Sequence, residues 1–140
     1  TKETIKLLKS GKYKFGRLNF ANGDMVGHTG NMAAAITACE TVDACVSDLV
    51  EEVNRLNGIT IITADHGNSD EMYTLKNNQP VPKTSHTLNP VPFVIIDSHY
   101  NKEYELRELK SAGLSNVAAT LCNLLGYEQP KDFDSSLIAF

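Results

Sequence analysis

Three separate segments of this chain supply aspartate and histidine side chains, which are common ligands of divalent metal ions. His28 follows Asp24 by four residues, in the segment Asp24-Met-Val-Gly-His28, which is the spacing of about one helical turn. Asp65 and His66 are adjacent, and His86 follows in a proline-rich stretch. Carboxylate oxygens and imidazole nitrogens suit manganese, zinc and similar ions. The residue types therefore indicate five candidate metal ligands: Asp24, His28, Asp65, His66 and His86.

Each candidate also has a purely structural interpretation. Asp24 and Asp65 are residues that commonly cap a turn or a helix through their carboxylates, which leaves a neighbouring histidine merely exposed. A single histidine in a loop, such as His86, is more often solvated than bound to an ion. His99 stands apart from the three clusters, and we expect it at the surface.

The predicted strands place these residues at one edge of a sheet. A β-branched run at 59–64 predicts a fully buried strand that ends at Asp65, and runs at 17–21 and 92–96 predict two more. Asp24 and His28 follow the first strand, and His86 precedes the third. Ligands of open α/β sheets bind beyond the carboxyl ends of the strands. For Asp24 and His28, one helical turn or a glycine-containing loop would both bring the pair together.

Helices are predicted on either side of these strands. Apolar residues recur at spacings of three and four from residue 31 to residue 56, and Asn57-Gly58 should end this helix with glycine in the left-handed conformation. Shorter helices are predicted at 2–8 and at 114–125, the second capped by Ser115. Its inward residues should be Val117, Ala118, Leu121, Leu124 and Leu125. Residues 65–92 read as a long functional loop with a short strand at 72–75, and residues 129–140 as an irregular tail. This order indicates an α/β fold.

Composition narrows the function classes. The chain has 140 residues, one domain's worth, and a net charge of -4, which gives no basic excess for binding nucleic acid. No apolar run approaches the ~20 residues of a membrane helix, and no segment reads as a signal peptide. Three widely spaced cysteines are expected to be reduced and packed as small hydrophobes, which favours a cytoplasmic location.

Five nitrogen and oxygen ligands exceed what one four-coordinate structural zinc ion needs. They suit a two-metal site that still lacks a ligand or two. Such sites are typical of phosphoryl transfer, where two ions stabilise the attacking and leaving oxygens.

Three long segments resemble one enzyme family. Residues 19–30 (NFANGDMVGHTG), 63–68 (TADHGN) and 85–92 (SHTLNPVP) are similar to the cofactor-independent phosphoglycerate mutases, members of the alkaline phosphatase superfamily. The segments at 113–121 and 125–127 resemble the C-terminal end of that family. The resemblance covers nearly the whole chain in order and spacing.

The resemblance implies a fold, a reaction and a metal centre. It implies a three-layer α/β sandwich with a mostly parallel sheet, present only in part. Asp24, His28 and His86 would hold one divalent ion, usually manganese, and Asp65 and His66 would supply two ligands of a second. The family interconverts 3-phosphoglycerate and 2-phosphoglycerate in glycolysis and gluconeogenesis through a phosphoserine intermediate. The parent enzyme is expected to be cytoplasmic and monomeric.

The resemblance also implies that parts of the enzyme are missing. Residues 1–140 would be the C-terminal part of the metal-binding domain, and the family's nucleophilic serine and inserted substrate-binding domain match nothing here. The chain alone is therefore expected to be inactive, and to expose a strand edge that invites self-association. Gly23 replaces a proline frequent in the family. A metal-dependent phosphatase or phosphodiesterase of the same superfamily, and a non-catalytic metal-binding or interaction module, stay open. Manganese, cobalt, magnesium and zinc also stay open.

Overall fold

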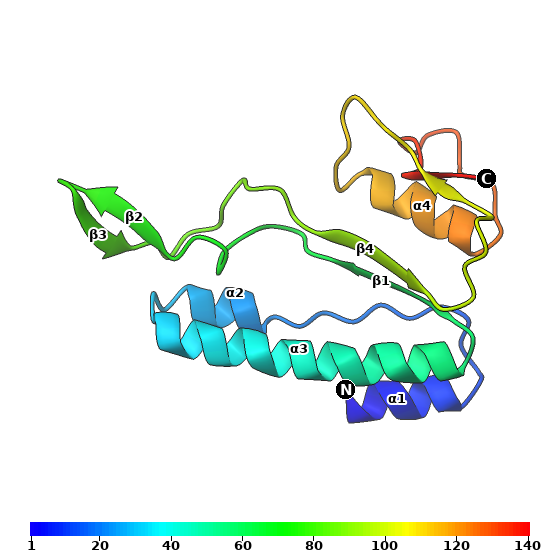
Figure 1. Cartoon of the computed structure of the whole chain (residues 1–140), viewed down its shortest axis with the longest axis horizontal. Helices are drawn as coiled ribbons and strands as arrows, with labels where there is room; N and C mark the ends of the chain where they lie inside the picture. The colour runs from blue at the N-terminus through cyan, green and yellow to red at the C-terminus, as the bar shows by residue number, and fades with distance from the viewer. The chain divides into compact units, whose positions relative to one another are not determined.

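A computed structural model describes all 140 residues and divides them into two compact units, residues 1–97 and 98–140 (Figure 1). Each unit is described by itself. The first contains α1 (Lys2–Lys9), α2 (Asn22–Gly27), α3 (Met32–Arg55), β1 (Ile59–Thr63), β2 (Tyr73–Lys76), β3 (Gln79–Pro82) and β4 (Phe93–Asp97). The second contains β5 (Glu105–Leu106), α4 (Asn116–Leu124) and β6 (Ile138–Ala139). No helix combines the length and the apolarity that crossing a membrane requires.

The long helix predicted for residues 31–56 is confirmed as α3. The side chain of Asn31 caps its first turn by accepting a hydrogen bond from the Ala34 amide at 3.0 Å. At its other end the amide of Gly58 donates to the carbonyl of Val53 at 2.9 Å, which is a Schellman ending. The prediction that glycine takes the left-handed conformation is wrong, because Asn57 takes it with φ 56°. Gly58 is needed for space, since a Cβ there would lie 2.9 Å from a Val53 methyl.

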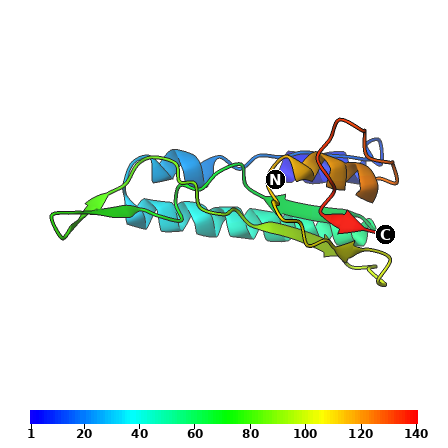
Figure 2. The same ribbon diagram turned by 90° about the horizontal axis from the view of Figure 1, so that it is seen from above.

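The helix α3 contacts α1, α2 and β1, and both views show α1 and α2 running alongside it (Figures 1 and 2). Its buried residues are Ala35, Ala38 and Glu52. The Glu52 carboxylate lies 3.3 Å from the Lys9 ammonium, so an ion pair joins α1 to α3. The periodic apolar stripe is only partly buried: Ile36 is 51% exposed, and Cys39 is exposed too. The fully buried residues of α3 are thus two alanines and a glutamate, and the larger apolar residues of the stripe are half-buried or exposed. The three cysteines are free, as expected, but Cys39 does not pack as a buried hydrophobe.

The strands β1 and β4 form an antiparallel ladder with Ile61 opposite Ile95 and Thr63 opposite Phe93. The predicted strands at 59–64 and 92–96 are thus confirmed, but the prediction of full burial at 59–64 is wrong, because Ile59 is 39% exposed. No strand forms at 17–21, where Leu18 is 46% exposed and no neighbouring strand is available to pair with it. The α/β class is confirmed. Every strand pair within the chain is antiparallel, so the mostly parallel sheet and its three layers remain predictions.

Residues 64–92 leave the end of β1 and return to the start of β4 (Figure 2). Within this excursion β2 and β3 form a hairpin whose turn places Asn77 and Asn78 at φ 52° and 59°. Two consecutive residues with positive φ make the tight hairpin turn that asparagine favours. The short strand predicted at 72–75 is confirmed in β2. The strand β3 was not predicted because it contains Pro80 and Pro82, which only an edge strand tolerates.

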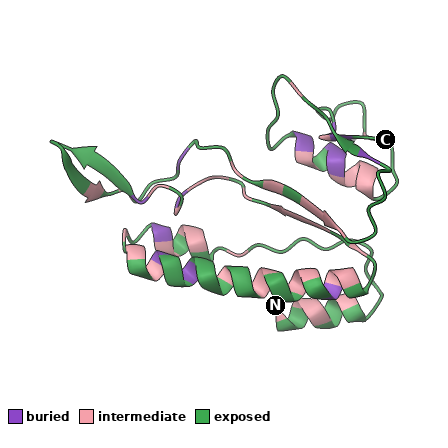
Figure 3. Ribbon diagram, viewed as in Figure 1, coloured by how far each residue is buried: buried purple, intermediate pink, exposed green.

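The second unit is built on α4, with β5 paired to β6 through Leu106 opposite Ile138. Tyr104, Ala119, Thr120 and Ile138 are buried in it. Figure 3 colours the buried parts of the ribbon purple, and some of them lie on α4. The Thr120 hydroxyl accepts a hydrogen bond from the Leu137 amide at 2.9 Å. The C-terminal tail, predicted to be irregular, is therefore fixed to α4 and contributes β6.

Two details of the predicted helix at 114–125 are wrong. Ser115 is the N-cap residue as predicted, but its side chain makes no capping hydrogen bond; the Asn116 side chain accepts one from the Gly113 amide at 2.7 Å. The buried face consists of Asn116, Ala119 and Thr120, whereas Ala118 and Leu125 are exposed and Val117, Leu121 and Leu124 are half-buried. A mixed polar face is inside because its polar groups bind the backbone of the tail, as the bond from the Asn116 amide to the Ser135 carbonyl shows.

Candidate metal centre

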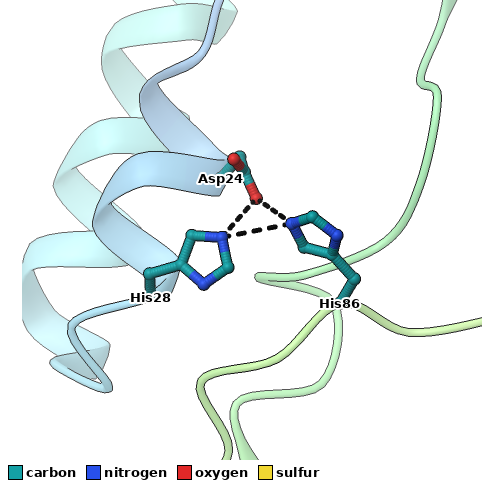
Figure 4. Close-up of side chains that lie close together, drawn as sticks. All are labelled: Asp24, His28 and His86. Atoms are coloured by element: carbon teal, nitrogen blue, oxygen red, sulfur yellow. Dashed lines mark hydrogen bonds and ion pairs between the residues drawn. The ribbon is translucent and has the colours of Figure 1, made fainter.

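Asp24, His28 and His86 form a triangle of ligand atoms (Figure 4). The Nε2 atoms of His28 and His86 lie 3.1 and 3.0 Å from Oδ1 of Asp24, and 3.1 Å from each other. Two ligand atoms about 2.1 Å from one ion are about 3.0 Å apart when they subtend a right angle at it. All three edges of the triangle match that separation. The donor set, one carboxylate and two imidazoles, therefore fits a divalent ion in both chemistry and spacing.

The helix α2 decides the geometry of the first two ligands. The amide of His28 donates to the carbonyl of Asp24 at 3.1 Å, so the residues are one helical turn apart and share a face. Of the two conformations considered for this motif, the helical turn is the one present.

A backbone carbonyl orients the His28 ring, and a backbone hydrogen bond holds the segment that carries His86. Nδ1 of His28 lies 2.6 Å from the Thr84 carbonyl, which only accepts, so Nδ1 carries the proton and Nε2 is left with a lone pair. Ligand histidines commonly have such an outer partner. His86 is held by its neighbour Thr87, whose amide donates to the Gly67 carbonyl at 2.9 Å. One segment, residues 84–87, thus supplies the partner of the His28 ring and carries His86.

The carboxylate of Asp70 joins the loop after His66 to the loop after His86. It accepts hydrogen bonds from the Asn89 amide group at 2.7 Å and from the Thr87 hydroxyl at 3.1 Å. These donors, Asn89 first, hold the pKa of Asp70 below its usual value. Gly67 allows the approach, because a Cβ there would lie 2.1 Å from the Thr87 hydroxyl oxygen. An ion pair of 2.8 Å between Lys83 and Glu71 adds a second link between the same loops.

Asp65 and His66 lie beside the triangle rather than in it. The His66 ring stacks on the His86 ring with centroids 3.6 Å apart and planes 18° from parallel. Nε2 of His66 is 3.7 Å from the Asp65 carboxylate, whose side chain is 75% exposed. The structure therefore brings His66 next to the three-ligand cluster and leaves Asp65 and His66 as a pair of potential donors. His99, as expected, is exposed.

Sequence reasoning missed Asn68, which is buried at 5% exposure and donates to Oδ1 of Asp24 at 2.7 Å. This hydrogen bond is the largest cause of a lowered pKa at Asp24. Ser69 next to it donates to the Gly23 carbonyl at 2.6 Å. The available signal was position: an asparagine directly after Asp65-His66-Gly67 is in reach of whatever that motif contacts.

Comparisons with known proteins found relatives that match nearly the whole chain. The chain is 46% identical over 147 aligned residues to a protein of Leptospira interrogans named as a probable 2,3-bisphosphoglycerate-independent phosphoglycerate mutase. It is 47% identical to the 2,3-bisphosphoglycerate-independent phosphoglycerate mutase of Trypanosoma brucei brucei. Each match covers 99% of this chain and 27% of the relative, so the chain spans about a quarter of the relatives' length.

A solved structure of Leishmania mexicana phosphoglycerate mutase, obtained at low cobalt concentration, has a TM-score of 0.92 and 46% sequence identity to this chain. The match covers 99% of this chain and 27% of that one. This chain therefore has the alkaline-phosphatase-like fold of the matched part of that enzyme. Residues 1–129 match the profile of the Metalloenzyme superfamily. The match covers most of the chain and includes all five candidate ligands, and the chain belongs to the Metalloenzyme superfamily.

Proposed function

We propose that this chain forms the metal-binding part of a 2,3-bisphosphoglycerate-independent phosphoglycerate mutase, which interconverts 3-phosphoglycerate and 2-phosphoglycerate. The observation that carries the proposal is the triangle of Asp24, His28 and His86, with edges of 3.0 to 3.1 Å. It occurs in a chain that is 46% identical, over 99% of its length, to a relative named for this activity.

Asp24, His28 and His86 are proposed to hold one divalent ion, and Asp65 and His66 to supply two ligands of a second. The orientation of His28 supports the first assignment, because its Nδ1 proton is used by the Thr84 carbonyl and Nε2 faces Asp24. Manganese is the proposed metal, since carboxylates and neutral imidazoles suit it. When bound, such ions offset negative charge on the oxygens of a transferring phosphoryl group.

Residues 1–140 are proposed to work together with further chain that supplies the nucleophilic serine and the substrate-binding domain. The Ser69 hydroxyl, close to the triangle, donates to the Gly23 carbonyl, which supports a structural use of this serine. The substrate would be phosphoglycerate, with neither nucleic acid nor a membrane as partner, and the parent enzyme a cytoplasmic monomer. Its complete sheet is proposed to be mostly parallel, with β1 and β4 as members of a three-layer sandwich.

A chimera tests this proposal. Residues 1–140 would replace the matching 27% of the Trypanosoma brucei brucei relative, and formation of 2-phosphoglycerate from 3-phosphoglycerate would be measured with Mn²⁺ present. We expect activity that His28→Ala abolishes and that His99→Ala, a change at an exposed histidine, leaves intact. Release of inorganic phosphate without 2-phosphoglycerate would favour the phosphatase alternative instead. A folded chimera with neither activity would contradict the proposed function.

A further inference from the structure

We propose that Asn68 is a positioning residue for the metal centre: its side-chain amide holds the Asp24 carboxylate in the orientation that faces His28 and His86. The inference rests on the proposed function, because it takes Asp24 as a metal ligand. Asn68 belongs to the loop that also carries Asp65 and His66, so this loop would serve both metal positions.

The contact is specific to the ligand atom. Nδ2 of Asn68 donates to Oδ1 of Asp24 at 2.7 Å, and Oδ1 is the oxygen that both imidazoles face. The same Nδ2 lies 3.3 Å from the Asp24 backbone carbonyl. Asn68 therefore contacts the side chain and the main chain of one residue, which fixes their relative orientation.

The orientation of the Asn68 amide follows from its surroundings. The reversed orientation would place the amide oxygen against two oxygens of Asp24, both of which are acceptors. In the orientation present, the Asn68 oxygen is buried and has no hydrogen-bond partner. Leaving a buried carbonyl unpaired is unfavourable. The site retains this unpaired oxygen and keeps the donor on the carboxylate, which points to a role for Asn68 beyond stabilising its own loop.

The Asn68 amide fits against α2 only because residue 27 is a glycine. Gly27, which is buried in α2 between the two ligands of that helix, lies so close that a Cβ would be 2.3 Å from the Asn68 oxygen. The helix and the loop are thus in contact at the amide itself. Ser69 supplies a separate hydrogen bond to the Gly23 carbonyl that does not involve the Asp24 carboxylate. Substituting Asn68 should therefore affect the orientation of the Asp24 carboxylate, whereas substituting Ser69 should affect only the attachment of the loop to α2.

The test compares Asn68→Ala with Ser69→Ala in the full 140-residue chain, with Co²⁺ as the probe. Asn68→Ala removes the two contacts of Nδ2 with Asp24, and Ser69→Ala removes the hydrogen bond to the Gly23 carbonyl, so both variants lose hydrogen bonding between the same loop and the same helix. Co²⁺ affinity would be measured by calorimetric titration, and the coordination of the ion by its visible absorption spectrum. Unfolding by urea in the presence of a chelator would measure the stability of each variant without metal.

We expect Asn68→Ala to weaken Co²⁺ binding about 10- to 100-fold and to change the spectrum, as loss of an outer partner of a metal ligand does. Ser69→Ala should lower stability to a similar extent and leave the spectrum unchanged. If Asn68→Ala does not fold, Asn68→Ser is measured in its place, since serine is too short to reach Oδ1.

Wild-type affinity and spectrum in a folded Asn68→Ala variant would overturn the positioning role alone. Equal losses of affinity in the two variants, with no spectral change, would also overturn it, because they indicate a purely structural effect. Absence of Co²⁺ binding by the wild-type chain would overturn the metal centre, and the positioning role with it.

Discussion

The Nε2 atoms of His28 and His86 lie 3.1 Å apart, although 58 positions separate the two residues in the sequence. Two imidazole lone pairs at that distance repel each other unless a proton or a cation lies between them. The same two atoms face one carboxylate oxygen, so negative charge is present where a cation would be bound.

Replacing either histidine should therefore weaken metal binding. We expect His28→Ala and His86→Ala each to lower Co²⁺ affinity by more than the roughly 10- to 100-fold typical of outer partners, because each removes a direct ligand. Calorimetric titration of the 140-residue chain measures the effect, with His99→Ala as the control. A His28→Ala variant that bound Co²⁺ like the wild type would remove this residue from the proposed ligand set.

Gly27→Ala should perturb the same centre from the helix side. The new methyl group would lie 2.3 Å from the Asn68 oxygen, so the loop must move away from α2. We expect a loss of about 1–3 kcal/mol in the free energy of unfolding, and weaker Co²⁺ binding. Gly16→Ala is the matched control, because a Cβ there meets no atom within 4 Å. Equal behaviour of the two variants in urea unfolding would contradict the close contact seen between α2 and the loop.

Acid should weaken the link between the two loops. The Asn89 amide and the Thr87 hydroxyl lower the pKa of Asp70 in the folded chain. A carboxyl with a lowered folded pKa contributes stability above its unfolded pKa, and that contribution is lost as pH falls through the folded value. The stability difference between wild type and Asp70→Asn should thus shrink below about pH 4.

Urea unfolding at pH 7 and pH 3 measures that difference for the Asp70→Asn variant. Asn89→Ala removes the donor with the largest effect on the pKa of Asp70. Like Asp70→Asn, it should make the free energy of unfolding depend less on pH. A difference between wild type and Asp70→Asn that stayed constant with pH would contradict the predicted linkage.

The second unit should depend on a single buried hydroxyl. Thr120→Val keeps the volume of the side chain but leaves the Leu137 amide without its acceptor, which costs about 1–3 kcal/mol. Thr41→Val on α3 is a matched control: the hydroxyls of Thr120 and Thr41 each donate to the carbonyl four residues earlier, at 2.8 Å, but that of Thr41 is exposed. We expect the control to change the unfolding free energy by less than about 0.5 kcal/mol. Similar losses in both variants would show that burial of Thr120 is unimportant.

The 140-residue chain by itself should show no mutase turnover and bind Mn²⁺ only weakly. The pair Asp65 and His66 offers only two donors, and the side chain of Asp65 is 75% exposed. A coupled assay for 2-phosphoglycerate and a calorimetric titration with Mn²⁺ measure the two properties. Turnover that Asp65→Ala abolishes, or two tight Mn²⁺ sites, would show that the chain needs no further ligands.

The candidate ligands could be predicted from the sequence because they lie in short motifs, and the spacing of Asp24 and His28 matches a helical turn. The long helix could be predicted because its periodicity extends over 24 residues. The pairing of β1 with β4 could not, since strand partners depend on contacts between distant residues. The absence of a strand at 17–21 has the same cause, because an isolated apolar run forms a strand only beside another.

Asn57 and Asn68 escaped prediction for different physical reasons. Asn57 takes the left-handed conformation, but the glycine that follows it is the residue usually expected there. Gly58 is needed for a different reason, because a Cβ at that position would clash with Val53. Asn68 contacts Asp24 across 44 positions, so its place after Asp65-His66-Gly67 indicates that it is near the ligands but does not identify its partner. Polar residues that orient ligands therefore need the three-dimensional structure to be found.

The ladder of β1 and β4 has a consequence for residues that it never touches. Thr63 and Phe93 face each other across it, so the chain between them is a closed loop that leaves and returns at one point. Closing a long loop has an entropic cost, and the pairing of β1 with β4 offsets this cost in the chain without a bound cation. The loop ligands are in this way preorganised, and preorganisation raises affinity by lowering the cost of ordering on binding. A substitution that frays the ladder would thus weaken ion capture from a distance, with the ligands themselves unchanged.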